Sequence, residues 1–355
     1  MHRPAQVLFA FLLALAAGAH CAPAVQSVPA ACKPGQAIRE ERFVSIGGIE
    51  QWVVIKGSDC RNPVLLIVHG GPGNPVSPFM DAMYAGWERD FTLVTWDQRG
   101  AGRTFGRNFV PPETTEQLLS PALLARDGVE VAAWAARRLG KRRVILFGGS
   151  WGSALAVHMA KLRPALFAAY VGTGQLVGGR ENLAASYART LGLARAAGHD
   201  KTVAELEALG APPWTEPRAP GILRRATRYY EARATDSAPP AWFERAPRYA
   251  GTLDRDHYHN GEDFSWLQYV GTSGGGMAAT HDLYRLGVDF GMPVFLVQGS
   301  ADLVTVPEVA RTYFDALKAP RKQFFLLERV GHDPNEAMLA TQLDILRRLA
   351  GPLGD

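Results

Sequence analysis

Short, uninterrupted apolar runs recur along the chain and predict strands that are buried on both faces. The runs are PVLLIVHGG at 63–71, FTLVTWDQRG at 91–100, RRVILFGGS at 142–150, PVFLVQGSAD at 293–302 and KQFFLLERVGHD at 322–333. Each ends in glycine or in polar residues, as buried parallel strands do. Helical patterns at 127–139 and 153–162 lie between them. Strands that alternate with helices predict an α/β fold, with a mostly parallel sheet and helices on both faces.

One segment near the start of this region has a different pattern. Residues 41–56 alternate apolar and polar positions around Gly47 and Gly48. A period of two around a pair of glycines predicts a β-hairpin that precedes the parallel strands.

A long internal segment contains helical patterns and no strong strand pattern. The helical patterns lie at 181–197 and 222–235, and a glycine-rich loop follows at 271–277. We therefore predict an α/β core in two parts, 25–175 and 291–355, with an inserted helical cap at 176–290.

The first residues have the organisation of an export signal. His2 and Arg3 precede the apolar run VLFAFLLALAAGA, which is shorter than a membrane span. We predict a signal peptide at 1–24, export to the periplasm or the medium, and no stable membrane insertion after its removal. Two cleavage frames stay open, and a lipoprotein site at Cys21 is disfavoured by the bulky His20 before it.

Composition describes an ordinary globular protein and excludes a nucleic-acid binder. The 355 residues are 47% hydrophobic and 20% charged, enough to bury a large core. The net charge is +4, but the arginines are scattered and form no basic run. The oligomeric state stays open.

Removal of the signal would leave two cysteines, Cys32 and Cys60. In an oxidising compartment paired thiols tend to form a disulfide, which here would close a loop of about 28 residues and contribute about 3 kcal/mol. The alternative is two unpaired thiols.

Ser150 lies where an apolar strand pattern meets a helical pattern. Gly148 and Gly152 flank it in the arrangement GxSxG, in which a tight turn tolerates no bulk two residues before or after the serine. Such a turn exposes the serine hydroxyl above the sheet and directs the next backbone N–H, that of Trp151, at the atom under attack. Ser150 is therefore a candidate nucleophile.

A serine nucleophile needs a histidine to accept its proton and a carboxylate to orient that histidine. In this type of sheet the order along the chain is serine, acid, histidine, with each residue just after a strand. Asp302 and His332 have these positions. Asp333 would point away from the imidazole, and Asp97 precedes the serine, so both are weaker candidates for the acid.

The glycine-rich sequence HGGPG at 69–73 directly follows a predicted strand. Glycines allow backbone N–H groups to approach a developing oxyanion closely. We expect the Gly71 N–H to supply one donor, with Gly70 as the competing residue, and the Trp151 N–H to supply the other.

These motifs together resemble the proline iminopeptidase family of α/β-hydrolases. The resemblance rests on the pair Asp302 and GHD at 331–333 and on HGGPG at 69–73, WDQRGAGRT at 96–104 and GGSWGS at 148–153. It implies an α/β-hydrolase fold with a helical cap and a serine peptidase that removes an N-terminal residue, usually proline. The implied roles are nucleophile for Ser150, orienting acid for Asp302, general base for His332 and oxyanion hole for the Gly71 and Trp151 amides. We also expect Asp97 and Arg99 to form a buried pair under the site.

The resemblance also implies acidic residues in the cap that bind the substrate's α-ammonium, one of them in a WxxWE motif. The nearest segment here is TRYYE at 227–231. Glu231 and Glu181 are the candidates, and the alternative is that both are solvated surface acids. The stretch DRDHYHNGED at 254–263 matches no metal-ligand spacing, and we predict no metal and no cofactor.

Three functions fit these observations. The first is an exported serine hydrolase of the proline iminopeptidase type that cleaves N-terminal peptide or amide bonds through an acyl-enzyme. The second is a carboxylesterase with the same triad acting on small esters. The third is a non-catalytic binding module on the same fold.

Overall fold

The computed structural model describes residue 33 and residues 35–216 and 218–350. The chain divides into two units, residues 1–30 and 31–355, and everything below concerns the second. The predicted signal peptide at 1–24 lies outside the described residues. Cys32 also lies outside the described residues, so its pairing with Cys60 stays a prediction. Among the described helices, none has the length and apolar character that a bilayer crossing requires.

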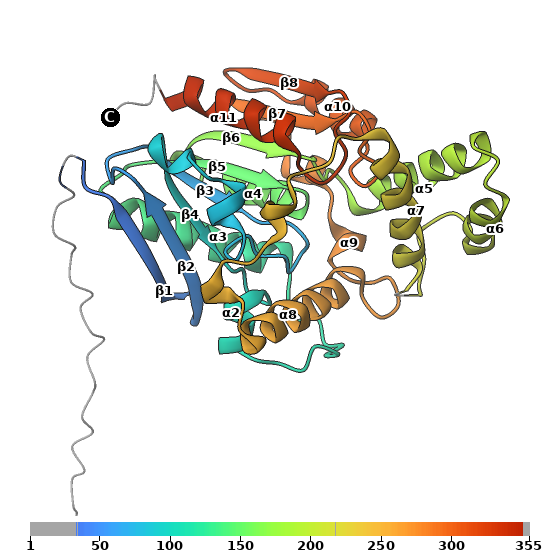
Figure 1. Ribbon diagram of the computed structural model, residues 1–355, viewed down its shortest axis with the longest axis horizontal. Helices are drawn as coiled ribbons and strands as arrows, with labels where there is room; N and C mark the ends of the chain where they lie inside the picture. The colour runs from blue at the N-terminus through green and yellow to red at the C-terminus, as the bar shows by residue number, and fades with distance from the viewer. Residues whose placement is uncertain (1–32, 34, 217, 351–355) are drawn as a thin grey trace, which may run out of the picture. The chain divides into compact units, whose positions relative to one another are not determined.

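The described part of the chain forms an eight-stranded sheet of order β1-β2-β4-β3-β5-β6-β7-β8 (Figure 1). β1 pairs antiparallel with β2, β2 pairs antiparallel with β4, and all other neighbours are parallel. The strands are β1 (Ile38–Ile46), β2 (Ile49–Gly57), β3 (Val64–Val68), β4 (Thr92–Trp96), β5 (Val144–Gly149), β6 (Phe167–Thr173), β7 (Val294–Gly299) and β8 (Lys322–Leu327). The expected hairpin is β1 and β2.

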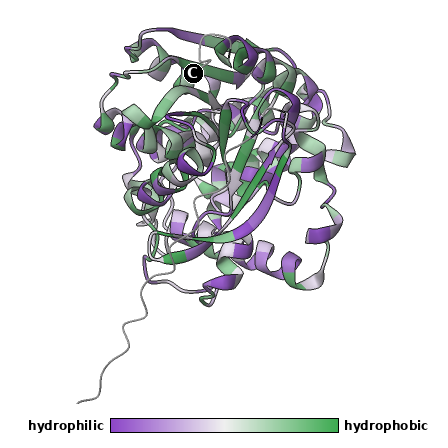
Figure 2. Cartoon of the chain, turned by 90° about the vertical axis from the view of Figure 1, so that its left-hand side faces the viewer, coloured by the Kyte–Doolittle hydropathy of each residue, from purple (hydrophilic) through white to green (hydrophobic). Residues whose placement is uncertain are grey.

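The two faces of the sheet bury separate cores, which explains the continuous apolar runs in the sequence. In β3, Leu66 belongs to one core, whereas Leu65 and Ile67 belong to the other. Figure 2 shows the central strands largely in the hydrophobic colour. One core packs against α3 (Pro121–Arg138), α4 (Trp151–Leu162) and α10 (Pro307–Ala316), and the other against α1 (Met80–Met83), η1 (Trp87–Arg89) and α11 (Glu336–Ala350). The predicted sheet with helices on both faces is confirmed.

The segment between β6 and β7 contains helices and, among its described residues, no strand of the sheet. It comprises α5 (Gly179–Ala196), α6 (Asp200–Leu209), α7 (Ala219–Ala234), η3 (Pro240–Phe243), η4 (Pro247–Tyr249), α8 (Thr252–Val270), α9 (Met277–Thr280) and η5 (Leu283–Leu286). α5, α6 and α7 pack on one another at the right of Figure 1 around a small core that includes Tyr187, Leu206 and Leu223. The remaining short helices are α2 (Gly102–Arg107) and η2 (Pro164–Leu166).

α8 packs apart from these three helices, against α2 (Figure 1). Arg103 of α2 joins the two, because its Nε and Nη2 donate to the Asp254 carboxylate at 2.6 and 3.0 Å. The Arg103 guanidinium also stacks on the Tyr249 ring, 4.1 Å from its centroid. Asp254, the first acid of the DRDHYHNGED stretch, therefore anchors the helical segment to the core.

Candidate active site

Ser150 lies in the tight turn between β5 and α4. Its φ of 54° and ψ of −126° place a non-glycine residue in a strained region of the backbone, as a nucleophile elbow requires. A Cβ on Gly148 would lie 2.4 Å from the Gly152 carbonyl oxygen, and one on Gly152 would lie 2.0 Å from the Val68 carbonyl oxygen. Both glycines are therefore required by close backbone approach.

We expect the Gly152→Ala substitution to destabilise the protein by about 3 kcal/mol or more, because the added carbon cannot fit beside the Val68 carbonyl without moving the elbow. The free energy of unfolding from urea titration measures this change. Gly192→Ala is the matched control, since that helical glycine has open space around its Cα. There we expect a stabilisation of up to about 1 kcal/mol. Equal stability of the two variants would contradict this account of the turn.

The structure brings Ser150, His332 and Asp302 together although they are far apart in the sequence. His332 Nε2 lies 2.9 Å from Ser150 Oγ, and His332 Nδ1 lies 3.1 and 3.2 Å from the two Asp302 carboxylate oxygens. Asp302 follows β7 and His332 follows β8. The three side chains form a hydrogen-bonded chain at the carboxyl ends of the strands.

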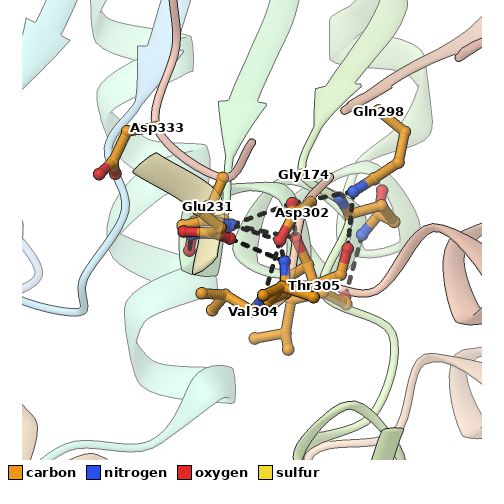
Figure 3. Close-up of polar contacts among 12 residues, drawn as sticks. Gly174, Glu231, Gln298, Asp302, Val304, Thr305 and Asp333 are labelled. Atoms are coloured by element: carbon orange, nitrogen blue, oxygen red, sulfur yellow. Dashed lines mark hydrogen bonds and ion pairs between the residues drawn. The ribbon is translucent and has the colours of Figure 1, made fainter. Parts of the chain in front are cut away.

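Four further hydrogen bonds hold the Asp302 carboxylate, which is fully buried (Figure 3). Gln298 Nε2 donates to Oδ2 at 2.9 Å, and Thr305 Oγ1 donates to the same oxygen at 2.7 Å. The backbone N–H groups of Val304 and Thr305 donate to Oδ1, each at 2.8 Å. Gln298 and Thr305 were not among the site residues predicted from the sequence. A glutamine inside the apolar run of β7 was the available signal for the first, and an Asp-x-x-Thr turn was the signal for the second.

The electrostatics of the pair favour an ionised Asp302 and a basic His332. Burial disfavours the carboxylate, but the charge of His332 and the hydrogen bonds from His332 and Thr305 outweigh it, so the pKa of Asp302 lies below its ordinary value. Burial also opposes charge on His332, but the Asp302 carboxylate outweighs it and raises the pKa of His332 above 6.5.

This raised pKa predicts the acid limb of the activity profile. Only neutral His332 can accept a proton from Ser150, and protonated His332 predominates at any pH below its pKa. We expect kcat/KM to rise with pH, with a midpoint above the ordinary histidine value of 6.5. A pH series of kcat/KM in constant ionic strength measures this midpoint. A midpoint below 6.5 would contradict the assigned Asp302 effect.

The HGGPG loop packs directly over the elbow. A Cβ on Gly70 would lie 3.2 Å from Ser150 Cβ and 3.8 Å from Ser150 Oγ. Gly71 has a φ of 108°, a conformation that favours glycine. On the other side of the serine, α4 begins at Trp151, so the Trp151 N–H has no acceptor within the helix. The two segments that carry the predicted oxyanion donors, Gly71 and Trp151, therefore lie on either side of Ser150.

The two cap acids have different surroundings. Glu231 is 7% exposed on α7, and its Oε1 accepts a hydrogen bond of 2.7 Å from the N–H of Leu303, next to Asp302 (Figure 3). Burial raises the pKa of Glu231, and the nearby charge of His332 offsets this only in part. The surface alternative is therefore wrong for Glu231. Glu181 is exposed in the first turn of α5, where partial burial and Asp282 raise its pKa.

The expected buried pair of Asp97 and Arg99 is wrong. Asp97 accepts hydrogen bonds from Ser77 Oγ at 2.5 Å and from the Arg103 N–H at 2.8 Å, and burial raises its pKa to about 7. Arg99 instead pairs with Asp127 of α3 at 2.9 Å. The two side chains leave the turn in different directions, so each finds its own partner.

Comparison with known proteins identifies the family. The family model described as serine aminopeptidase, S33, matches residues 60–336. The chain belongs to this family of α/β-hydrolases. It is 28% identical to "Probable aminopeptidase YbaC" of Bacillus subtilis over 82% of this chain and 90% of that protein. It is also 28% identical to "Probable proline iminopeptidase" of Streptomyces coelicolor, over 79% and 88%.

A solved proline iminopeptidase from Mycobacterium smegmatis has the same fold. It superimposes with a TM-score of 0.61 at 19% identity, covering 88% of this chain and 98% of that structure. The resemblance to proline iminopeptidases and the predicted α/β-hydrolase fold are confirmed. The chain is thus a hydrolase with aminopeptidase relatives.

Proposed function

We propose that this protein is an exported serine aminopeptidase of the proline iminopeptidase type, with Ser150 as nucleophile, His332 as general base and Asp302 as the orienting acid. One observation carries the proposal, namely the 2.9 Å contact between His332 Nε2 and Ser150 Oγ at the head of a strained elbow. The family relationship supports the same reaction class.

In the proposed reaction Ser150 Oγ attacks the carbonyl carbon of the scissile amide as its proton moves to His332 Nε2. The N–H groups of Gly71 and Trp151 stabilise the oxyanion that forms. His332 then donates the proton to the leaving amine, the C–N bond breaks, and an acyl-serine remains. Water attacks the acyl carbon and gives a proton to His332. As the bond between the acyl carbon and Ser150 Oγ breaks, His332 returns this proton to Ser150 Oγ and the acid is released.

Recognition of a free N-terminus needs a negative charge close to the reacting carbonyl, and Glu231 is well placed for it. It comes from the helical segment, is buried and lies beside the loop of Asp302. Of the two acids nominated in the sequence, Glu231 alone has a hydrogen bond to that loop among the described residues. We propose that its Oε2 receives the substrate ammonium.

We expect the Glu231→Gln substitution to raise KM for proline p-nitroanilide by about 10-fold or more, because it removes the charge, worth about 1.4 kcal/mol or more, while keeping the acceptor for the Leu303 N–H. Hydrolysis of p-nitrophenyl acetate, which has no amine, should stay within about 2-fold. Steady-state kinetics with both substrates measures how far the effect on proline p-nitroanilide exceeds the effect on p-nitrophenyl acetate. Glu207→Gln, on the exposed surface of α6, is the control. An equal effect on both substrates would contradict the assigned ammonium contact.

An esterase is the second candidate function, and one observation favours it. Both Glu231 oxygens already have partners, since Oε2 lies 3.4 Å from Arg224 Nη1. This contact leaves less capacity for an ammonium group. The deciding experiment compares proline p-nitroanilide, its N-acetylated form and short p-nitrophenyl esters. Cleavage that requires the free amine supports the aminopeptidase, and cleavage of esters alone supports the esterase.

A further inference from the structure

A network of buried hydrogen bonds joins the two segments that flank Ser150. The mechanism above does not use it. Its members are His69, at the start of the HGGPG loop, Gln98, after β4, and Trp151, at the start of α4. His69 is 1% exposed and Gln98 is 2% exposed, so both are shielded from water. Buried polar groups of this kind fix the geometry of what they contact.

The hydrogen bonds of His69 determine its tautomer. The backbone N–H of Gln98 points at His69 Nε2 at 3.0 Å, and because an amide nitrogen can only donate, Nε2 must accept. The proton of the neutral ring is therefore on Nδ1, which donates to the Gly70 carbonyl oxygen at 2.9 Å. Burial lowers the pKa of His69 to about 4, which keeps the ring neutral at pH 7.

This donation sets the direction of the peptide between Gly70 and Gly71. The Gly70 oxygen also accepts a hydrogen bond from the Asn74 N–H at 3.3 Å, so two donors fix its position. In a trans peptide the N–H points opposite to the C=O. The Gly71 N–H is therefore directed away from His69, on a loop whose Gly70 already lies against Ser150.

The Gln98 side chain extends the same restraint to the second segment. Its Nε2 donates to the His69 carbonyl oxygen at 2.9 Å, and its Oε1 accepts from the Trp151 indole N–H at 3.3 Å. The indole can only donate and the carbonyl can only accept, so the orientation of the Gln98 amide is fixed. Gln98 thus links the start of the HGGPG loop, at the His69 carbonyl, to the indole of Trp151 at the start of α4.

We propose that His69 and Gln98 are positioning residues that set the oxyanion hole: neutral His69 orients the Gly70–Gly71 peptide, and Gln98 fixes that loop to Trp151. This inference rests on the proposed function, because it assigns these residues to the stabilisation of the oxyanion formed on Ser150 attack. Neither residue contacts the reacting atoms, so their effect acts through the two backbone donors.

The test compares variants that keep or remove single hydrogen bonds. His69→Leu removes both ring contacts, whereas His69→Asn keeps a donor where Nδ1 was. Gln98→Met removes the contacts to the His69 carbonyl and to Trp151 at similar side-chain size, and it remains informative if His69→Leu does not fold. His199→Leu is the matched control, because it removes a histidine that bonds to Tyr230 in the helical segment.

We expect His69→Leu and Gln98→Met to lower kcat by about 10- to 100-fold with KM within about 2-fold, because misdirected donors weaken only the transition state. Affinity for a peptide boronate, which forms a tetrahedral adduct on Ser150, should fall in parallel. His69→Asn should recover most of the loss, and His199→Leu should lose none. Unchanged kcat in both variants, a change confined to KM, or His69→Asn as inactive as His69→Leu would overturn the proposal.

A measurement that needs no turnover separates this inference from the proposed function. The ¹⁵N chemical shifts of the His69 ring, assigned by comparison with His69→Asn, report which nitrogen carries the proton. We expect the neutral Nδ1–H tautomer throughout pH 5.5–8. An Nε2–H tautomer, or titration near pH 6.5, would overturn the positioning geometry. Absence of all turnover in the wild-type protein would overturn the proposed function instead.

Discussion

Ser150→Ala is expected to lower kcat by about 10⁴- to 10⁶-fold while changing the free energy of unfolding by no more than about 1 kcal/mol. The substitution removes the nucleophilic oxygen and one hydrogen bond to His332, and both residues place the same Cβ at the strained elbow. Steady-state kinetics and urea unfolding of the same preparation measure the two effects.

Ser120→Ala is the control, a substitution that should lower stability without lowering kcat. Its side chain caps α3 by accepting a hydrogen bond from the Leu123 N–H at 3.2 Å. Loss of an N-cap costs about 1 kcal/mol of stability, and we expect kcat to be unchanged. If Ser150→Ala kept wild-type kcat, the reaction would not proceed through this hydroxyl.

Asp302→Asn is expected to lower kcat by about 10⁴-fold and to move the acid limb of kcat/KM to lower pH. An asparagine amide carries no charge to raise the pKa of His332, and burial then lowers it. Whichever carboxylate oxygen the NH2 group replaces, it faces two of the four existing donors, and His332 Nδ1 keeps only the other oxygen as an acceptor. A pH series of kcat/KM for this variant and the wild type measures both effects.

Asp333→Asn is the matched control for this prediction. Asp333 is adjacent to His332 in sequence, but its side chain is 68% exposed and lies apart from Asp302 in Figure 3. We expect kcat within about 2-fold of wild type. If Asp333→Asn lost activity and Asp302→Asn retained it, the acid of the triad would be misassigned.

Much of the sheet and the elbow could be predicted because local patterns determine them. Strands buried on both faces must be apolar at every position, and only glycine fits at Gly148 and Gly152, where a Cβ would meet backbone oxygen. The order of Ser150, Asp302 and His332 followed from the strands that precede them. Their roles stay a proposal until they are tested.

The remaining contacts depend on side-chain direction between distant segments, which spacing along the chain does not define. Asp97 and Arg99 are two residues apart, yet one binds Ser77 and the other binds Asp127. For Glu231 the sequence left both a binding role and a surface position open, and the packing of α7 buries it beside Leu303. A role for His69 could not be predicted from the sequence, because the Gln98 N–H that fixes its tautomer comes from the loop after β4.

The most direct test of the account is covalent labelling of the wild-type protein with a fluorophosphonate, followed by mass spectrometry of the peptides. Attack by an activated serine oxygen on phosphorus displaces fluoride and leaves a stable adduct on the nucleophile. We expect one adduct per chain, on Ser150, with labelling that declines as His332 is protonated and is absent in Ser150→Ala. An adduct on another residue, or equal labelling of wild type and Ser150→Ala, would contradict it.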